Sequence, residues 1–139
     1  MPPLTRWYLR TALVCFVAAL LSAVLLAVRG LVALPAVVGA LTPVYFHLLM
    51  VGWVTQLIFG VVFWMFPKQS AARPRGSERL GWATFALLNV GLLLRVIAEP
   101  WQTLAPGALP GSLVALSAVL QWLAGLAFVV NTWPRVKER

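Results

Sequence analysis

The stretch VYFHLLMVGWVTQLIFGVVFWMFPK, from Val44 to Lys68, decides the fold, because no charged side chain interrupts it before its last residue. An α-helix needs about 20 consecutive, predominantly apolar residues to cross the hydrocarbon core of a bilayer. Three further stretches meet this requirement. The sequence therefore predicts four transmembrane helices, at residues 7–28, 43–66, 80–99 and 111–133.

The composition leaves no room for a water-soluble domain. Of the 139 residues, 62% are hydrophobic and 10% are charged, whereas soluble domains are about half apolar and a quarter charged. The longest connections, 67–79 and 100–110, are too short to bury a core of their own. We expect residues 1–139 to form one all-α integral membrane domain, a four-helix bundle with up-down-up-down topology.

The basic residues predict the orientation of this bundle. Nine of the 11 lysines and arginines lie beside the chain termini or between the second and third spans, and only Arg29 and Arg95 lie near the other side. The positive-inside rule places the basic side, with both termini, in the cytoplasm. The net charge of +8 is thus explained by basic residues that lie at helix ends, against the membrane surface. Because the charges lie at helix ends and follow no continuous face, we expect no nucleic-acid binding.

His47 is the only histidine, and the predicted orientation places it near the outer boundary of the second span. The third span runs outward, so Arg95 should lie at the same depth. Two interpretations of Arg95 remain open: an interfacial side chain paired with Glu99 at i,i+4 spacing, or part of a functional site. His47 is likewise either a neutral imidazole bonded to a neighbouring helix or a ligand.

Haem b is the cofactor that these residues permit. It requires an axial imidazole, an apolar slot and cationic partners for two propionates. On a regular helix of 100° per residue, the apolar stripe beside His47 continues through neighbouring turns. The candidate haem-binding residues are His47 as the metal ligand, Met50, Val54 and Ile58 for the slot, and Arg95 and Arg29 for the propionates.

The few side chains that could bind a metal limit the kind of site. With one histidine, and with Met50 and Met65 on the same helix face, one chain offers a five-coordinate haem at most. A six-coordinate haem would need a homodimer or a larger partner subunit. A mononuclear zinc or copper site lacks further ligands, because Cys15 lies alone in the first span, where we expect a small core residue.

The segments YFHLLM (45–50), TQL (55–57) and WMFP (64–67) resemble the second transmembrane helix of subunit I of haem-copper oxidases and nitric oxide reductases. In that family an outer-end histidine of this helix binds the low-spin haem, so the resemblance implies the same role for His47. In position and hydropathy the whole chain is similar to the first four helices of such a subunit. Small proteins of this kind also resemble the third, small subunit of some thermophilic cytochrome c-dependent nitric oxide reductases.

The resemblance implies a haem-binding electron-transfer or accessory subunit of a respiratory system in the cytoplasmic membrane of a bacterium or archaeon. The family's other haem and metal histidines lie on later helices, so this chain by itself lacks the centre that reduces oxygen or nitric oxide. A cofactor-free accessory or assembly subunit remains an alternative. A small transporter or channel component is a second alternative, disfavoured because no charge lies at the midplane and no span is broken.

The remaining polar and small residues predict helix packing. Gln56, Asn89, Ser117 and Gln121 should form interhelical hydrogen bonds, and Gly125 should continue the packed face of the last helix. Gly52 and Gly60 should mark a close approach of two helices. Ser77 should cap the third span, and the basic segment 67–79 should rest on an anionic lipid surface.

Overall fold

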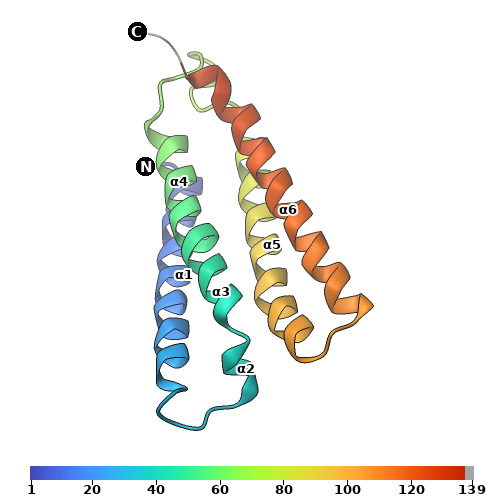
Figure 1. The fold of residues 1–139 in the computed structure, drawn as a ribbon. Helices are drawn as coiled ribbons and strands as arrows, with labels where there is room; N and C mark the ends of the chain where they lie inside the picture. The colour runs from blue at the N-terminus through green and yellow to red at the C-terminus, as the bar shows by residue number, and fades with distance from the viewer. Residues whose placement is uncertain (137–139) are drawn as a thin grey trace.

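Four long helices run alternately up and down in the computed structural model, which describes residues 1–136 (Figure 1). They are α1 (Pro3–Val28); a second span composed of α3 (Thr42–His47), η1 (Leu48–Thr55) and α4 (Gln56–Met65); α5 (Glu78–Leu104); and α6 (Ala108–Thr132), continued by η2 (Trp133–Arg135). A short helix, α2 (Ala36–Gly39), lies in the first connection. All four are long and apolar enough to cross a membrane. The predicted set of four apolar helices is confirmed; Lys137 and Arg139, used to predict orientation, lie outside the described residues.

For α5, the third long helix, the predicted cap is confirmed and the predicted end is wrong. Ser77 caps α5 as predicted, because its Oγ accepts a hydrogen bond of 3.3 Å from the Leu80 N–H. The predicted end at Glu99 is wrong, since α5 continues through the buried Pro100 to Leu104. Proline removes a single backbone donor from the helix. Ending the helix in apolar surroundings would leave several backbone groups without partners.

The second span contains a π-helical segment, η1, that begins directly after His47. Its turns are wider than α-helical turns. The Thr55 hydroxyl donates to the Met50 carbonyl within this segment, at 2.8 Å. From Val44 to Gly60 the buried positions of the span follow at intervals of four residues, at 44, 48, 52, 56 and 60, and the next buried residue, Phe63, follows after three. A regular helix would bring residues to one face every 3.6 residues, so the π-helical segment rotates the faces away from those predicted.

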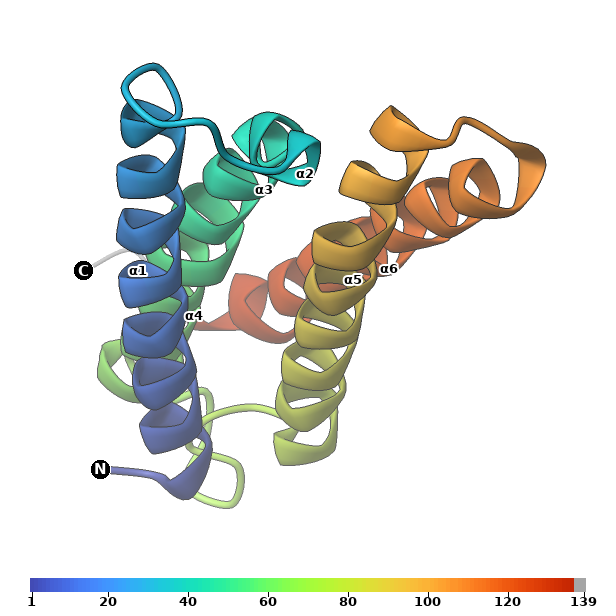
Figure 2. The ribbon, with the colours of Figure 1, turned by 90° about the horizontal axis from the view of Figure 1, so that it is seen from below.

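The helices pack as two hairpins, α1 with the second span and α5 with α6 (Figures 1 and 2). Within the first hairpin, a Cβ atom added to Gly52 would lie 2.8 Å from the Cβ of the buried Cys15. A Cβ added to Gly60 would lie equally close to the Cβ of Tyr8, at 2.8 Å. The predicted close approach at both glycines is therefore confirmed, as is the role of Cys15 as a small core residue.

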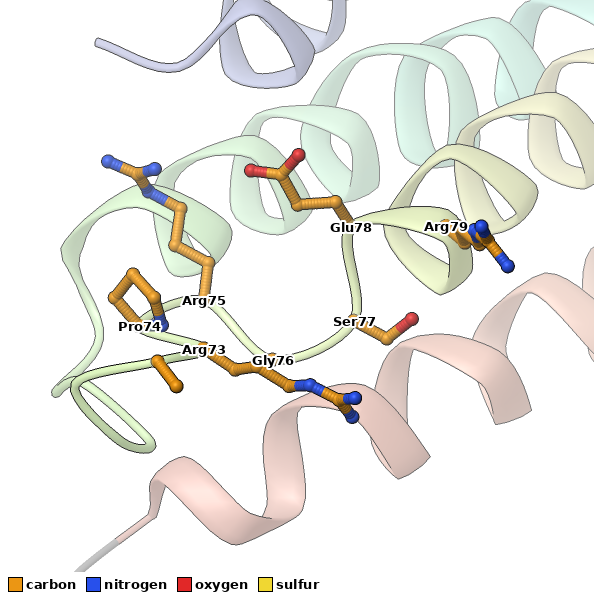
Figure 3. Close-up of a pocket in the computed structure, with 8 residues that line it drawn as sticks. Arg73, Pro74, Arg75, Gly76, Ser77, Glu78 and Arg79 are labelled. Carbon is orange, nitrogen blue, oxygen red and sulfur yellow. The ribbon is translucent and has the colours of Figure 1, made fainter.

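The connection between α4 and α5 lies at the end of the bundle that also holds the start of α1 and the end of α6; we call this the basic end (Figures 1 and 3). Arg135, which is 1% exposed, donates to the carbonyls of Phe66 at 2.8 Å and Pro67 at 3.1 Å. These carbonyls lie where the second span ends and its helical bonds stop. Asn131 Oδ1 accepts from the Ser77 N–H at 2.8 Å, so α6 holds both ends of the connection.

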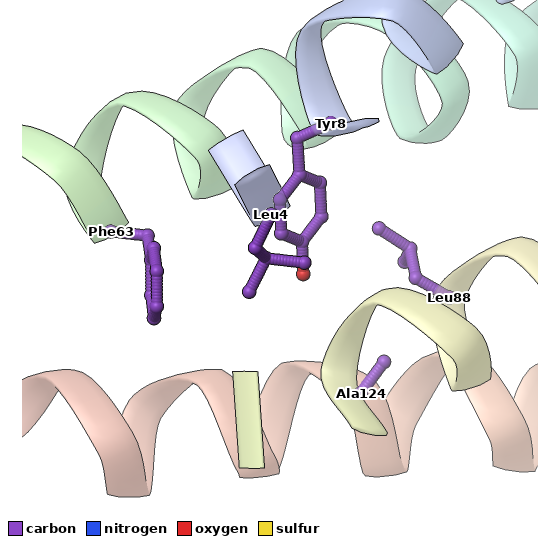
Figure 4. Close-up of a cluster of buried hydrophobic side chains, with 5 residues drawn as sticks. All are labelled: Leu4, Tyr8, Phe63, Leu88 and Ala124. Atoms are coloured by element: carbon purple, nitrogen blue, oxygen red, sulfur yellow. The ribbon is translucent and has the colours of Figure 1, made fainter. Parts of the chain in front are cut away.

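Hydrophobic side chains from all four long helices meet between the two hairpins. One cluster consists of Leu4 and Tyr8 from α1, Phe63 from α4, Leu88 from α5 and Ala124 from α6 (Figure 4). Aromatic contacts add to it, with Phe59 stacked on Phe128 at a centroid distance of 3.8 Å. This apolar packing lies nearer the basic end, whereas the polar residues discussed next lie farther along the same seam.

Candidate functional site

His47 is the last residue of α3 and is followed directly by η1. Its Nδ1 atom lies 2.9 Å from the carbonyl oxygen of Pro43, one turn earlier. A carbonyl oxygen only accepts hydrogen bonds, so this contact requires the hydrogen on Nδ1. The lone pair of the neutral ring is then on Nε2, which has no hydrogen-bond or ion-pair partner within residues 1–136. An imidazole held in this way is prepared to act as a ligand through Nε2.

Glu99 of α5 approaches the same imidazole from the opposite hairpin. Its Oε2 lies 3.3 Å from His47 Nδ1, and its side chain is 10% exposed. Oε2 has no hydrogen-bond partner among the described residues, because the single Nδ1 hydrogen is directed to Pro43. The carboxylate of Glu99 therefore lies beside the imidazole of His47, and the two groups share no hydrogen bond of good geometry.

Arg95 balances the charge of Glu99 and connects it to the last helix. Its Nη1 donates to Glu99 Oε1 at 3.2 Å, which confirms the predicted i,i+4 pair. Its Nε donates to the hydroxyl of Ser117 at 3.1 Å, and that hydroxyl donates to the Gly91 carbonyl at 2.7 Å. His47, Glu99, Arg95 and Ser117 thus form one polar cluster, which joins the two hairpins near the ends of α3 and α5.

The other predicted haem-binding residues do not gather around the imidazole. Met50 and Ile58 are 53% and 52% exposed. Each lies two residues from a buried position of the span (48, 52, 56 or 60) and therefore on the outward side of the helix. The wide turns of η1 produce this arrangement. Val54, partly buried, belongs to the same outward series. Arg29 lies beside Gly39 of α2, where an added Cβ would be 2.7 Å from its Nη1.

These positions decide how far the chain fits a haem. The imidazole fits the role of axial ligand, since Nδ1 is anchored and Nε2 is available. Arg95 is engaged by Glu99 and Ser117, and the predicted slot is an outward apolar surface. Within residues 1–136 the chain therefore provides an anchored imidazole, and the other predicted haem-binding residues do not complete a pocket around it.

A second group of polar side chains lies between the same two hairpins, nearer the middle of the helices. Asn89 Nδ2 donates to Gln56 Oε1 at 3.2 Å, and the fully buried Gln56 donates to the Gly52 carbonyl at 3.0 Å. The interhelical hydrogen bond predicted for these amides is confirmed. Gln121 donates to Ser117 at 3.5 Å within α6. Gly125 does not continue a closely packed face, because an added Cβ would have nothing within 4 Å.

Sequence reasoning missed the contact of Glu99 with His47 and the burial of Arg135. A signal for the first was present: Arg95 was expected at the depth of His47, and Glu99 lies one turn further along the same helix. Arg135 carried no comparable signal, because a basic residue after a span usually marks only the topology.

Comparisons with known proteins add no relative. No protein-family model matches the chain, and no similar curated protein or solved structure was found. The residues and the geometry of the polar cluster are therefore what point to a function.

Proposed function

We propose that this chain is a haem b-binding membrane subunit that serves electron transfer or accessory functions in a respiratory haem-copper oxidase or nitric oxide reductase system. It spans the cytoplasmic membrane of a bacterium or archaeon, with its basic end in the cytoplasm. The observation that carries the proposal is the anchoring of His47 Nδ1 by the Pro43 carbonyl at 2.9 Å, which leaves Nε2 for the iron. The resemblance of residues 45–67 to the haem-binding helix of that family supports the same assignment.

One chain would hold the haem only in part. His47 would bind the iron through Nε2, while a second copy or a larger subunit would supply most of the apolar surface and the partners of the propionates. The bound haem supplies one-electron transfer. The chain's own contribution is to hold the imidazole in one tautomer and one orientation, with the carboxylate of Glu99 beside it and the guanidinium of Arg95 neutralising that carboxylate.

A cofactor-free accessory or assembly subunit is the second candidate. The observation that favours it is that the polar cluster already connects the two hairpins through its own side chains. In this case His47 contributes to docking of the hairpins. Such a protein would co-purify with an oxidase or reductase core without contributing a haem.

The deciding experiment measures haem in the purified protein. The chain is produced in bacterial membranes supplied with a haem precursor and purified in mild detergent. A reduced-minus-oxidised spectrum and the haem content per chain are then recorded. The proposal expects a b-type spectrum in the wild type and its loss in His47→Gly. Added imidazole should restore the spectrum of His47→Gly, because a free ligand can occupy the vacated space; a structural role alone would not produce this rescue.

Gln56→Leu is the matched control, since it removes a buried polar side chain from the same helix without touching His47. It should keep its haem. A wild type that is free of haem would reject a haem shared between copies of this chain, and a His47→Gly variant that keeps all of its haem would reject His47 as the ligand. Co-purification with a haem-containing core would then favour the second candidate.

A further inference from the structure

A cavity of about 600 Å³ opens at the basic end, formed by residues 72–79 of the α4–α5 connection and the first residues of α5 (Figure 3). Three arginines line it: Arg73, Arg75 and Arg79. None of their guanidinium groups forms an ion pair or a side-chain hydrogen bond within residues 1–136. The backbone around the cavity therefore carries three arginines without an ion-pair partner among the described residues, whose side chains point in different directions in Figure 3, and Glu78 is the only carboxylate among the lining residues.

The connection around the cavity is held in shape by its own hydrogen bonds. Gln69 N–H donates to the Pro74 carbonyl at 3.1 Å, and Gly76 N–H donates to the Arg73 carbonyl at 3.2 Å. Gly76 has a positive φ of 77°, which favours glycine. The bond from Ser77 to Asn131 fixes the connection to α6. The arginines are thus carried by a backbone that is already ordered.

An apolar notch adjoins this cationic cavity. Glu78 lines the cavity and also a smaller one of about 50 Å³, whose other walls are Pro2, Pro3, Leu4, Phe63 and Trp82. Trp82 is 41% exposed and lies one turn into α5. Tryptophan is the side chain enriched where a membrane's acyl chains meet its headgroups. Cationic and apolar surfaces are therefore adjacent, as are the phosphate and the first methylene groups of a lipid.

We propose that the cavity lined by Arg73, Arg75 and Arg79 binds the phosphate headgroup of an anionic phospholipid, with the start of an acyl chain against the notch at Trp82. The apolar notch favours a lipid over free phosphate, because inorganic phosphate gains nothing from an apolar wall. Arginine suits the headgroup because its planar guanidinium presents two N–H groups to a phosphate. The proposal is independent of haem binding, since the cavity and the polar cluster lie at opposite ends of the helices.

The test uses spin-labelled phosphatidylglycerol and spin-labelled phosphatidylcholine in phosphatidylcholine vesicles that contain the protein. The motionally restricted fraction of each label gives its relative association with the protein. Arg73→Gln/Arg79→Gln removes two charges from the cavity. Arg6→Gln/Arg10→Gln removes two charges from the same predicted side of the membrane, outside the cavity, and is the matched control. Circular dichroism verifies that both variants keep their helices.

We expect the wild type to prefer phosphatidylglycerol. If each cavity arginine contributes roughly fivefold to the association, as a basic residue does at an anionic surface, the cavity variant should lose up to about 25-fold of the preference. The control variant should lose less, because Arg6 and Arg10 do not line the cavity. Trp82→Ala should weaken association of the lipid, and millimolar inorganic phosphate should not displace the label. Equal losses in the two double variants would refute the site in favour of diffuse charge. Displacement by inorganic phosphate, or an unchanged Trp82→Ala, would refute its lipid specificity.

Discussion

Replacing Gly60 by alanine tests the close contact between α1 and α4. The added Cβ would lie 2.8 Å from the Cβ of Tyr8, which is fixed directly to the backbone of α1 and cannot rotate away. Carbon atoms are in best contact at about 3.5–4.0 Å, so the helices must separate by about 1 Å. That movement also stretches the bond of 3.2 Å from the buried Thr5 hydroxyl to the Gly60 carbonyl.

The magnitude follows from two opposing effects. Alanine in place of glycine favours the helix by about 1 kcal/mol, whereas overpacking costs about 1–3 kcal/mol. Gly125→Ala provides the matched control, because it changes the same residue type in a helix where an added Cβ meets nothing within 4 Å. We expect Gly125→Ala to be neutral or more stable than wild type, and Gly60→Ala to lie about 1–3 kcal/mol below Gly125→Ala in free energy of unfolding.

The assay is unfolding by sodium dodecyl sulfate added to protein in mild detergent, followed by circular dichroism. Both variants are compared with wild type at the same detergent concentration, so that the intrinsic gain from alanine cancels in the difference. If Gly60→Ala proves as stable as Gly125→Ala, the helices are not in the close contact described here.

Three further substitutions probe other contacts by the same unfolding assay. Arg135→Ala should lower the free energy of unfolding by about 2–4 kcal/mol, since it removes two charge-assisted bonds to the carbonyls of Phe66 and Pro67; Arg6→Ala, which removes an exposed arginine, should change it little. Ser117→Ala should cost about 1 kcal/mol, because it removes the acceptor of Arg95 Nε and the donor to the Gly91 carbonyl; a stability equal to wild type would contradict the polar cluster. Gly76→Ala should cost about 1–2 kcal/mol from its positive φ alone, and more from the Asn131 side chain; Gly107→Ala, which meets only ordinary contacts with Pro110, is its control.

Most of the features predicted correctly depend on the residues of one helix. Hydropathy located the four spans, the i,i+4 spacing gave the pair of Arg95 and Glu99, and the position of Ser77 gave a cap. The hydrogen bond between Gln56 and Asn89 also followed, because polar groups inside an apolar bundle need partners. The spans, the ion pair and the cap rest on local rules that neighbouring helices do not override, whereas the bond between Gln56 and Asn89 also needs two helices in contact.

The features that were missed depend on how the helices lie against one another. Whether Glu99 reaches His47 is decided by the register between α3 and α5, which no single-helix pattern specifies. The run through Pro100 depends on the surroundings of α5 and not on the proline itself. Met50 and Ile58 were assigned to the face of His47 by assuming 100° per residue, and the π-helical segment invalidates that assumption.

The segment Leu48–Thr55 also makes the second span adjustable at one place. A π-helical segment is equivalent to an α-helix with extra chain taken up locally, so deleting one residue there would let the helix return to regular turns. The part that carries His47 and the part that carries Gly60 would then keep nearly the same relative orientation, because the wide turn takes up the extra residue without rotating its flanks. A one-residue deletion in a regular part of the span would instead rotate one part relative to the other by about 100°. The chain within Leu48–Thr55 can thus be shortened by one residue without turning the imidazole away from Glu99.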